Sequence, residues 1–364
     1  MKRIVFTVTN DLSYDQRMQR ICTSLANAGY NVLLVGRKLH DSVALKNAVF
    51  SQKRLRCIFN KGFLFYAEYN ARLFFFLLFT KMDAVCAIDL DTILPCYFVS
   101  VIKNRKRIYD AHELFTEMKE VITRSEIKKR WMAIEKFAVP KFKNGYTVSY
   151  SIAEEFKKRY GAEYAVIRNL PYKKATSQTV NQQQKILLYQ GAVNEARGLE
   201  NLVVAMKEIN AVLFMYGDGN IFNKIKSLID THELNKKVFL KGKVLPEELN
   251  VITSKAYAGI NLVEPQGLNQ LYSLANKFFD YIQAGIPQLT MNFPEYKKIN
   301  DEYEIAVLIN SVDVDEIADA LNILLTDGVL YKRLKSNCIK AREIYVWNEE
   351  EKQLLNFIKI CLIN

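Results

Sequence analysis

The repeated alternation of short apolar runs with longer amphipathic segments constrains the fold of this chain more than any other feature. The sequence opens with the apolar run "KRIVFTV", the amphipathic segment "DQRMQRICTSLANAGY" and a second apolar run, "NVLLVGR". Near-continuous apolar runs of this length are typical of parallel strands that are buried on both faces. The alternation continues to about Pro171, which predicts a doubly wound α/β domain.

A polar segment then interrupts the pattern, and the alternation starts again after it. The segment "KKATSQTVNQQQ" has the composition of a linker, and "KILLYQG", "GLENLVVAMKEI" and "AVLFMYGDG" open a second series of strands and helices. We expect two Rossmann-like βαβ domains that face a central cleft, and a last helix that crosses back to the first domain. The expected boundaries are 1–172 for the first domain, 173–184 for the linker, 185–345 for the second domain and 346–364 for the C-terminal helix.

Charge is divided unevenly between the two halves. Residues 1–170 contain 29 Lys and Arg against 16 Asp and Glu, a net charge of +13, whereas residues 171–364 contain 22 against 23. Such an asymmetry favours an acidic partner for the first half, and a solvated basic face without a partner is the alternative. An anionic membrane, a phosphorylated acceptor and nucleic acid all have the required charge. Nucleic acid is not expected, because the sequence has no basic and aromatic motif of a known nucleic-acid reader.

One apolar stretch raises the question of a membrane. In "GFLFYAEYNARLFFFLLFTKMDAV" the uninterrupted part, 73–79, is far shorter than the about 20 residues that a span needs, so a buried helix is favoured. The stretch follows the basic segment "KRLRCIFNK", and cations beside aromatic residues suit a peripheral membrane contact. The start of the sequence has no secretory signal pattern. We therefore expect a cytoplasmic protein that contacts the inner face of the cytoplasmic membrane peripherally at most.

Metal and disulfide chemistry are not expected. The six cysteines form no CxxC pair or Cys/His cluster and read as small core residues, and the three histidines are too few for a His-rich metal site. We expect no metal and no cofactor.

Ligands of open α/β sheets bind at the carboxyl ends of the strands, so the segments after each strand are the candidate sites. The first such loop, "TNDLSYDQR", contains no glycine, which argues against an ordinary dinucleotide site. Asp11, Asp15 and Arg17 instead place polar groups there, on the side where an acceptor would bind. The alternative is that Asp11 or Ser13 only caps the helix that follows.

Three ionisable residues follow another predicted strand in "YDAHE". Asp110, His112 and Glu113 are more than one helix cap requires. A histidine can donate a hydrogen bond to a sugar hydroxyl, and an acid can accept a proton, so these three are the candidate catalytic residues. A purely structural polar network is the alternative.

In the second half, "YQGAVNEARGLENL" places Gly191 after a strand and Arg197 before a helix. A glycine loop, a permanently charged guanidinium and a helix N-terminus suit a diphosphate. Gly217, in "YGDG", is a second glycine at a strand end.

The segment "SLANKFFDYIQAGIPQ" predicts a helix that ends at Gly285. Asn276 is expected to cap it, Lys277 to add charge at its first turn, and Asp280 to lie on the face of Asn276, where a carboxylate can hold the two hydroxyls of a ribose. The alternative is a capped helix whose acid only complements the dipole.

These blocks resemble a known family. "YQGAVNEARGLENL", "LFMYGDG" with "KVFLKGKV", and "LANKFFDYIQAGIP" occur in the order found in retaining GT-B-fold glycosyltransferases, the large family of bacterial surface-polysaccharide enzymes and sucrose- and glycogen-type synthases. The first-half segments "YDAHELFTEM" and "TVSYSIAEEFKKRYGAEYAVIRNLP" are similar to first domains of the same group. In two positions where the family often has glutamates this chain has Tyr272 and Asp280.

The resemblance implies a role for each candidate residue. Arg197, with Asn276 and Lys277 beside it, would neutralise the diphosphate of a nucleotide-sugar donor, Asp280 would hold the ribose, and His112 would approach the donor sugar across the cleft. It implies transfer of a sugar, with retention, from a nucleotide-diphosphate sugar to a lipid-linked or polysaccharide acceptor in bacterial surface-glycan synthesis. Two alternatives stay open: a nucleotide-sugar epimerase or hydrolase of the same fold, and a non-catalytic scaffold in a polysaccharide-assembly complex.

Overall fold

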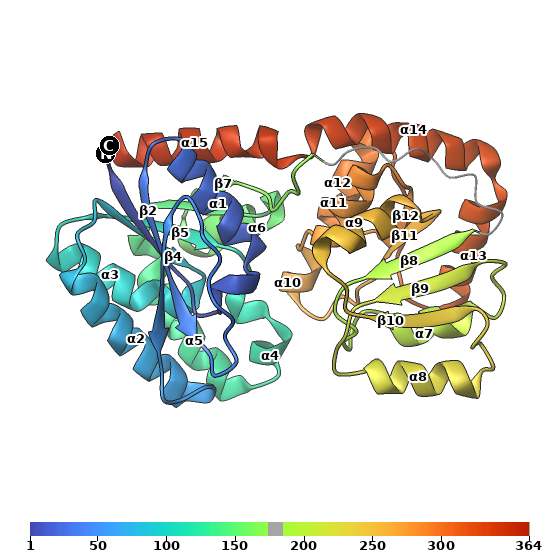
Figure 1. Ribbon diagram of the computed structural model, residues 1–364, viewed down its shortest axis with the longest axis horizontal. Coiled ribbons are helices and arrows are strands. Elements are labelled where there is room, and N and C mark those ends of the chain that lie inside the picture. Colours follow the sequence, from blue (N-terminus) through green and yellow to red (C-terminus); the bar gives the residue numbers. More distant parts are fainter. Residues whose placement is uncertain (174–184, 364) are drawn as a thin grey trace. The chain divides into compact units, whose positions relative to one another are not determined.

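The protein consists of two compact units, each with its own parallel sheet (Figure 1). The computed structural model describes residues 1–173 and 185–363, without the side chain of Tyr14. Unit 1 comprises Met1–Asn169 and Glu350–Asn364, and unit 2 comprises Leu170–Glu349. The expected linker, 173–184, lies outside the described residues except for Lys173.

Unit 1 has a seven-stranded sheet in the order β3-β2-β1-β4-β5-β6-β7, and every neighbouring pair is parallel. The strands β1, β4 and β5 are almost wholly buried, as their apolar runs predict. Their bounds are β1 (Arg3–Thr7), β2 (Asn31–Lys38), β3 (Ser51–Arg56), β4 (Ala84–Ile88), β5 (Lys106–Ala111), β6 (Asn144–Thr147) and β7 (Ala165–Val166).

Helices cover both faces of this sheet. Tyr109 of β5 points to the face covered by α6, where its ring meets Phe156, and its neighbour Asp110 points to the other face, where Arg17 of α1 lies. The helices are α1 (Gln16–Asn27), α2 (Gly62–Phe79), α3 (Ile93–Ile102), α4 (Lys119–Ile122), α5 (Ser125–Ala138) and α6 (Tyr150–Tyr160), with the short 3₁₀ turns η1 (Leu12–Tyr14), η2 (Leu90–Thr92), η3 (Phe115–Glu117) and η4 (Val139–Lys141).

The last helix, α15 (Trp347–Ile363), packs on unit 1 from Glu350 onward. The Glu350 carboxylate accepts a hydrogen bond from the Arg168 backbone N–H at 2.7 Å, and the ring of Phe357 meets that of Tyr146 of β6 edge-on at 5.3 Å. Residues from the far end of the sequence thus complete the core of the first unit.

The basic segment before α2 and the apolar stretch within α2 differ in part from expectation. Residues 53–56 form part of β3 at the edge of the sheet, hydrogen-bonded to β2. α2 buries Phe65, Tyr69, Leu73 and Leu77, one residue per helical turn, so the expected helix forms but is buried along one side only. Its exposed apolar residues are Phe63, Leu64, Phe75 and Phe79. Among the described residues, no helix combines the length and the apolar character needed to cross a membrane.

Unit 2 has a six-stranded parallel sheet in the order β10-β9-β8-β11-β12-β13. Helices α7, α8 and α13 lie on one face and α9, α11, α12 and α14 on the other (Figure 1). The strands are β8 (Ile186–Gln190), β9 (Val212–Tyr216), β10 (Val238–Gly242), β11 (Ala258–Asn261), β12 (Gln288–Met291) and β13 (Ala306–Ile309). The helices are α7 (Leu199–Ala205), α8 (Phe222–Thr231), α9 (Pro246–Ser254), α10 (Leu268–Leu271), α11 (Asn276–Ala284), α12 (Pro294–Tyr303), α13 (Val314–Thr326) and α14 (Gly328–Ile344).

The expected pair of Rossmann-like domains is therefore confirmed. Both sheets are parallel, and both have their central strand first in sequence, with β1 and β8 flanked by strands added on either side. The carboxyl ends of neighbouring parallel strands meet at one edge of each sheet, and the side chains that follow them define the candidate sites.

Candidate active site

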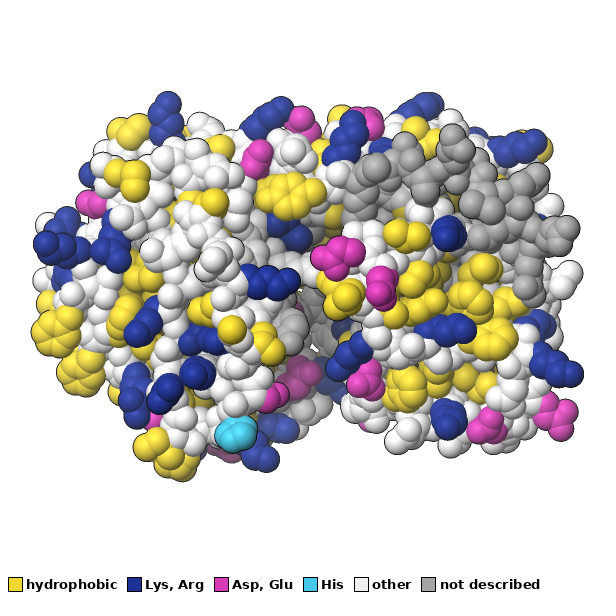
Figure 2. Space-filling model, viewed as in Figure 1, with side chains coloured by type: hydrophobic (Ala, Val, Ile, Leu, Met, Phe, Trp, Pro, Cys, Tyr) yellow, Lys and Arg dark blue, Asp and Glu magenta, His cyan; other side chains and the backbone are white. Residues whose placement is uncertain are grey.

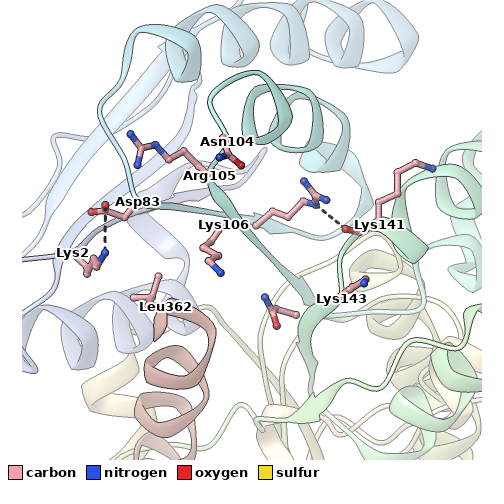
Figure 3. A pocket seen from close by; sticks show the side chains of 10 residues that line it. Lys2, Asp83, Asn104, Arg105, Lys106, Lys141, Lys143 and Leu362 are labelled. Atoms are coloured by element: carbon pink, nitrogen blue, oxygen red, sulfur yellow. Dashed lines mark hydrogen bonds and ion pairs between the residues drawn. The ribbon is translucent and has the colours of Figure 1, made fainter. Parts of the chain in front are cut away.

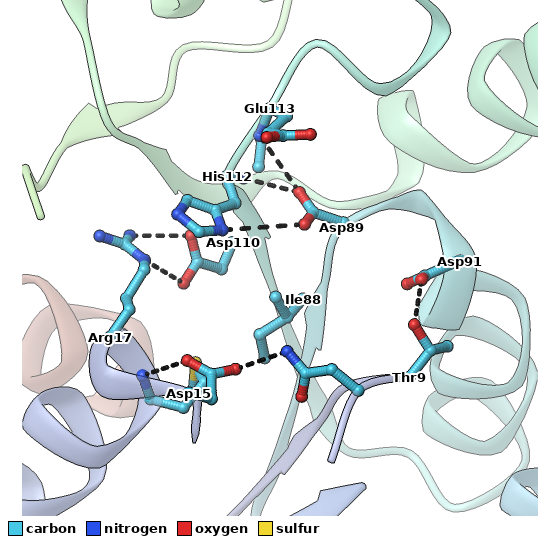
Figure 4. A network of polar contacts seen from close by, with 12 residues as sticks. Thr9, Asp15, Arg17, Ile88, Asp89, Asp91, Asp110, His112 and Glu113 are labelled. Carbon is cyan, nitrogen blue, oxygen red and sulfur yellow. Dashed lines mark hydrogen bonds and ion pairs between the residues drawn. The ribbon is translucent and has the colours of Figure 1, made fainter. Parts of the chain in front are cut away.

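In unit 1, a network of polar side chains lies at the carboxyl edge of the sheet (Figure 4). It draws on the loop after β1, which leads into α1, and on the segments that follow β4 and β5. Figure 4 shows the acids Asp15, Asp89, Asp91, Asp110 and Glu113 around His112. Two of these acids, Asp89 and Asp91, were not among the residues singled out from the sequence.

Asp110 and Arg17 form a buried ion pair at the base of this network. The guanidinium donates to the two carboxylate oxygens at 3.0 and 3.4 Å and to the Ile167 carbonyl oxygen at 3.3 Å. Both side chains are almost fully buried. The expectation that Arg17 faces an acceptor is therefore wrong, because the charge of Asp110 requires a partner inside the unit. The same pairing leaves Asp110 as a support beneath His112 rather than an accessible proton acceptor.

Asp11 and Asp15 hold the β1–α1 loop in place. The Asp15 carboxylate accepts from the Met18 backbone N–H at 2.9 Å and so caps α1, whereas Asp11 caps η1 through the Ser13 N–H at 3.0 Å. Asp11 also forms an ion pair with Arg54 of β3 at 3.1 Å, with both side chains nearly buried. The alternative that Asp11 or Ser13 caps the helix is therefore wrong for α1, because Asp15 caps α1 and Asp11 caps only the 3₁₀ turn η1.

The His112 side chain is 36% exposed and that of the neighbouring Asp89 is 20% exposed. Its Nδ1 lies 3.9 Å from a carboxylate oxygen of Asp89. Burial, and then the nearby Arg17 guanidinium, lower the pKa of His112 to about 3. The imidazole is therefore neutral near pH 7, and a neutral imidazole can donate one hydrogen bond and accept another.

Asp89 holds the segment that carries His112. Its carboxylate accepts from the backbone N–H groups of His112 at 2.9 Å and Glu113 at 3.2 Å, and its own N–H donates to the Asp110 carbonyl oxygen at 2.9 Å. Its φ is +53°, a conformation that costs a non-glycine residue about 1–3 kcal/mol. Burial, and then the charges of Glu113, Asp91 and Asp110, raise the pKa of Asp89 well above its usual value.

Asp91 accepts a hydrogen bond from the Thr9 hydroxyl, and burial is the main cause that raises its pKa to about 6. The sequence signal for both residues was available, because "DLD" directly follows a buried strand at the edge where ligands bind.

In unit 2, two glycines bring the loops after β8 and β9 together. The Gly191 N–H donates to the Tyr216 carbonyl oxygen at 2.9 Å, and the Val193 N–H donates to the Asp218 carbonyl oxygen at 3.1 Å. A Cβ at Gly217 would lie 1.8 Å from the Gly191 carbonyl oxygen, and Gly217 has a φ of +141°. Gly217 thus shapes the loops after β8 and β9 through backbone contact, since no larger residue fits there.

A lysine lies beside this glycine pair, and the charge of Arg197 acts on it. The Lys277 ammonium lies 4.0 Å from the centre of the Tyr189 ring and next to Gly191. Burial, and then the Arg197 guanidinium, lower the pKa of Lys277 well below its usual value. No carboxylate within 4.0 Å pairs with Lys277 or Arg197 in the parts of the chain that the structure describes. A pair of cations held together without a counter-ion has the charge required to bind an anion.

Helix α11 presents Asp280 to the end of β8. The carboxylate accepts from the Gln190 side-chain amide at 3.2 Å, and the same amide accepts from the Thr253 hydroxyl at 2.7 Å. The expected cap is wrong by one residue, because Ala275 is the N-cap, no side chain caps the helix, and Asn276 is its first helical residue. The Ala275 N–H instead donates to the Tyr296 hydroxyl at 3.0 Å. The expected end is confirmed, since Gly285 has a φ of +69°.

The segment between β11 and α11 carries Tyr272, one of the two departures from the family pattern, and the acid Glu264. Tyr272 closes α10, and the N–H of Glu264 donates to the Ala196 carbonyl oxygen at 3.0 Å, next to Arg197. Glu264 is thus close in space to the Arg197 loop although it lies 67 positions further along the sequence.

The second half of the chain is similar to a known protein family. Residues 173–341 match the model of a family described as "Glycosyl transferases group 1". An uncharacterized glycosyltransferase of Methanocaldococcus jannaschii is 24% identical over 190 residues, which are 50% of this chain and 47% of the relative. The poly(ribitol-phosphate) alpha-N-acetylglucosaminyltransferase of Staphylococcus aureus is 26% identical over 146 residues, 40% of this chain and 28% of the relative. The matches therefore span less than half the length of these curated relatives.

Solved structures match over nearly the whole chain. Sucrose-phosphate synthase from Thermosynechococcus elongatus superposes with a TM-score of 0.79 at 16% identity, over 99% of this chain and 98% of the other. The Anabaena protein Alr3699/HepE, solved in complex with UDP and glucose, superposes with a TM-score of 0.76 at 11% identity, over 99% and 100%. At these identities the likeness establishes the fold of both units.

Proposed function

We propose that this GT-B glycosyltransferase, whose second unit carries a group 1 glycosyltransferase domain, moves a sugar with retention from a nucleotide-diphosphate sugar to a glycan or lipid-linked acceptor in surface-glycan synthesis. One observation carries the proposal: the Lys277 ammonium lies beside Gly191 and over the Tyr189 ring, no carboxylate of the described residues pairs with it, and the charge of Arg197 acts on it. A diphosphate supplies the missing negative charge. Its binding is favoured because the bound anion offsets the repulsion between the two positive charges.

Asp280 is suited to the nucleoside end of the same ligand. It lies one helical turn after Asn276 at the start of α11, and the Gln190 amide orients its carboxylate. A carboxylate can accept from two vicinal hydroxyls at once, and this is the contact we assign to the ribose.

Charge stabilisation is the catalytic contribution that we assign to unit 2. Departure of the nucleoside diphosphate concentrates negative charge on the leaving phosphate, and fixed cations that already face that position stabilise it without reorganisation. Arg197 and Lys277 perform this role in the proposal. His112 is the candidate contact with the sugar in unit 1, because its neutral imidazole can donate to a hydroxyl.

The acceptor class rests on charge. Residues 350–364 contain two glutamates and two lysines, so unit 1 keeps the net charge of +13 of residues 1–170. A pyrophosphate-linked or otherwise anionic acceptor at the inner face of the cytoplasmic membrane complements such a surface. The Staphylococcus relative, named as acting on poly(ribitol-phosphate), gives the same class of anionic glycan as an acceptor to test.

A thermal-shift panel of UDP, GDP, ADP and CDP with their sugar derivatives tests donor binding. One nucleotide is expected to stabilise the wild type, and Arg197→Ala and Asp280→Ala are each expected to weaken its binding about 10- to 100-fold, because each removes a charged hydrogen bond. The exposed ion-paired residues Arg333 and Asp301 of unit 2 provide matched controls, and Arg333→Ala and Asp301→Ala are expected to keep the shift.

Absence of a shift with every nucleotide would contradict the proposal. With the donor identified, the anomeric configuration of the product, read by NMR, tests retention. Release of free sugar without transfer to any acceptor would favour the hydrolase alternative.

A further inference from the structure

The amino edge of the unit 1 sheet, opposite the His112 network, combines a basic pocket with exposed apolar residues. The strands β1, β4, β5 and β6 begin at this edge, and the helices α2, α3 and α5 end there, because each of these helices precedes a strand of a parallel sheet. We propose that this edge is a docking surface for a bilayer of anionic phospholipid. The inference goes beyond sugar transfer and does not depend on it.

The pocket has a volume of about 460 Å³ and an unbalanced lining (Figure 3). Asp83 is the one acidic residue in it, and it is paired with Lys2 at 4.0 Å. Its cationic residues are Lys2, Arg105, Lys106, Arg107, Lys141 and Lys143. A surface pocket with this excess of positive charge attracts phosphate groups.

The cations of the pocket divide into two groups. Arg107 is fixed, since it donates to the Lys141 carbonyl oxygen at 2.7 Å and its guanidinium lies 5.3 Å from the centre of the Tyr97 ring. Lys106, in contrast, points toward the middle of the lining residues in Figure 3, where Leu362 of α15 forms one wall. Lys106 and Lys143 form no ion pair within 4.0 Å among the described residues, so both are available to a phosphate group.

An apolar surface adjoins the pocket. The rings of Phe98 and Phe137 lie 6.3 Å apart, and the Lys141 ammonium lies 3.8 Å from the centre of the Phe137 ring. Lys103 joins this group to the end of α2, because its ammonium donates to the Leu78 carbonyl oxygen at 3.0 Å. The exposed apolar residues of the surface are Phe79, Phe98, Val101, Ile102 and Phe137.

This combination fits a lipid surface better than a soluble partner. Phe79 is 84% and Ile102 61% exposed, and burying such side chains in a bilayer removes apolar area from water. Cations that lie beside aromatic rings at the rim can reach headgroup phosphates while the rings lie deeper. Figure 2 shows hydrophobic side chains among lysines and arginines over α2 and α3 on the face in view. Charge complementarity therefore selects an anionic bilayer as the occupant.

Co-sedimentation of the full chain with vesicles tests the docking surface. We expect binding to vesicles that contain phosphatidylglycerol, no binding to pure phosphatidylcholine, and a loss of binding at high salt. Lys106→Gln with Lys143→Gln is expected to lower the partition coefficient about 25-fold, since each cation near an anionic surface contributes about fivefold. Phe79→Ser is expected to lower it about tenfold, and because Phe79 is exposed, this variant keeps the test valid if the lysine variant misfolds.

Matched controls come from α14 of unit 2. Lys332→Gln and Val329→Ser replace an exposed cation and an exposed apolar residue there, and both are expected to leave vesicle binding unchanged. Equal binding to both kinds of vesicle, no binding to the anionic kind, or a loss confined to the control variants would overturn the proposal. The nucleotide thermal shift, measured on the same variants, keeps a failure of donor binding separate from a failure of docking.

Discussion

At the scale of single residues, Lys277 is an ammonium whose surroundings oppose its charge. Burial and Arg197 both lower its pKa in the free protein. A bound diphosphate reverses the second effect and raises the pKa again. At pH values between the Lys277 pKa of the free protein and that of the complex, nucleotide binding must therefore take up a proton. The affinity for the nucleotide must fall as the pH rises through the Lys277 pKa of the complex.

Calorimetry of the stabilising nucleotide measures this proton uptake directly. Titrations in buffers of different ionisation enthalpy, at several pH values between about 7 and 10, are expected to show uptake by the wild type. Lys277→Met removes the titrating group, so the uptake is expected to disappear and the affinity to drop about tenfold or more. Equal uptake in both proteins would assign the proton to another group and contradict the role given to Lys277.

Asp91 makes stability depend on pH. The folded protein releases the Asp91 proton at about pH 6, whereas the unfolded chain releases it at about pH 4. The folded state binds more protons between these values, so stability falls as pH rises through this window. Asp91→Asn removes the charge and is expected to raise the free energy of unfolding by about 1–2 kcal/mol at pH 7 and by much less near pH 4.5.

Thermal denaturation of the Asp91→Asn variant at these two pH values measures the difference. The exposed Asp41 serves as the control, and Asp41→Asn is expected to give no pH-dependent gain. A gain that is equal at both pH values would mean that the carboxylate of Asp91 is not desolvated in the folded state.

At the scale of elements, the loops that follow β8 and β9 depend on Gly217. Gly217→Ala would place a Cβ 1.8 Å from the Gly191 carbonyl oxygen, so the loop must shift. We expect a loss of stability of about 3 kcal/mol or more, together with loss of the nucleotide thermal shift. Gly242 also has a positive φ, +69°, but a Cβ there would meet nothing within 4 Å. Gly242→Ala is therefore expected to lower the free energy of unfolding by about 1 kcal/mol and to keep the nucleotide thermal shift. A larger loss of stability for Gly242→Ala than for Gly217→Ala would contradict this prediction.

The elements also show which sequence signals were sufficient. The strand β1, the helix α1 and the Gly285 end of α11 follow from apolar periodicity and from the preference of helix ends for glycine. The strand β3 did not follow, because "SQKRLR" has no apolar alternation, and its pairing with β2 at the sheet edge decides its structure.

At the scale of the whole molecule, the C-terminal helix stabilises a unit whose other part ends at Asn169, about 180 positions before the helix joins it at Glu350. Leu354 and Ile358 are fully buried in unit 1. Leu354→Ala and Ile358→Ala are each expected to destabilise unit 1 by about 2–5 kcal/mol while the nucleotide shift of unit 2 is kept. Differential scanning calorimetry, with Ile360→Ala as the control on an exposed face, checks this, and lowered stability of unit 2 alone would contradict it.

For the candidate site, the sequence located the correct strand ends but not the partners of each residue. Arg197 and Lys277 were identified because their residue types and helix-start positions are readable from sequence order. Arg17 was misassigned, since its partner Asp110 lies 93 positions away. The position of Asp89 at a strand end was readable from the sequence, but its contacts with the His112 and Glu113 backbone exist only once β4 and β5 are neighbours.

The sequence by itself determined the two parallel α/β units, because apolar periodicity and helix-end chemistry are local and survive in the order of residues. It also marked Arg197, Lys277 and Asp280 as candidates for a donor site, and this assignment stays a prediction. The tertiary structure alone decided which charges are paired and which are not. Arg17 is neutralised and Lys277 is not, although both are cations near the start of a helix. Desolvation and Coulomb interactions depend on distance in space, so they are decided only once the chain has folded. The fold likewise brings Lys2, Lys106 and Lys141 to one edge of unit 1, although they are far apart in the sequence.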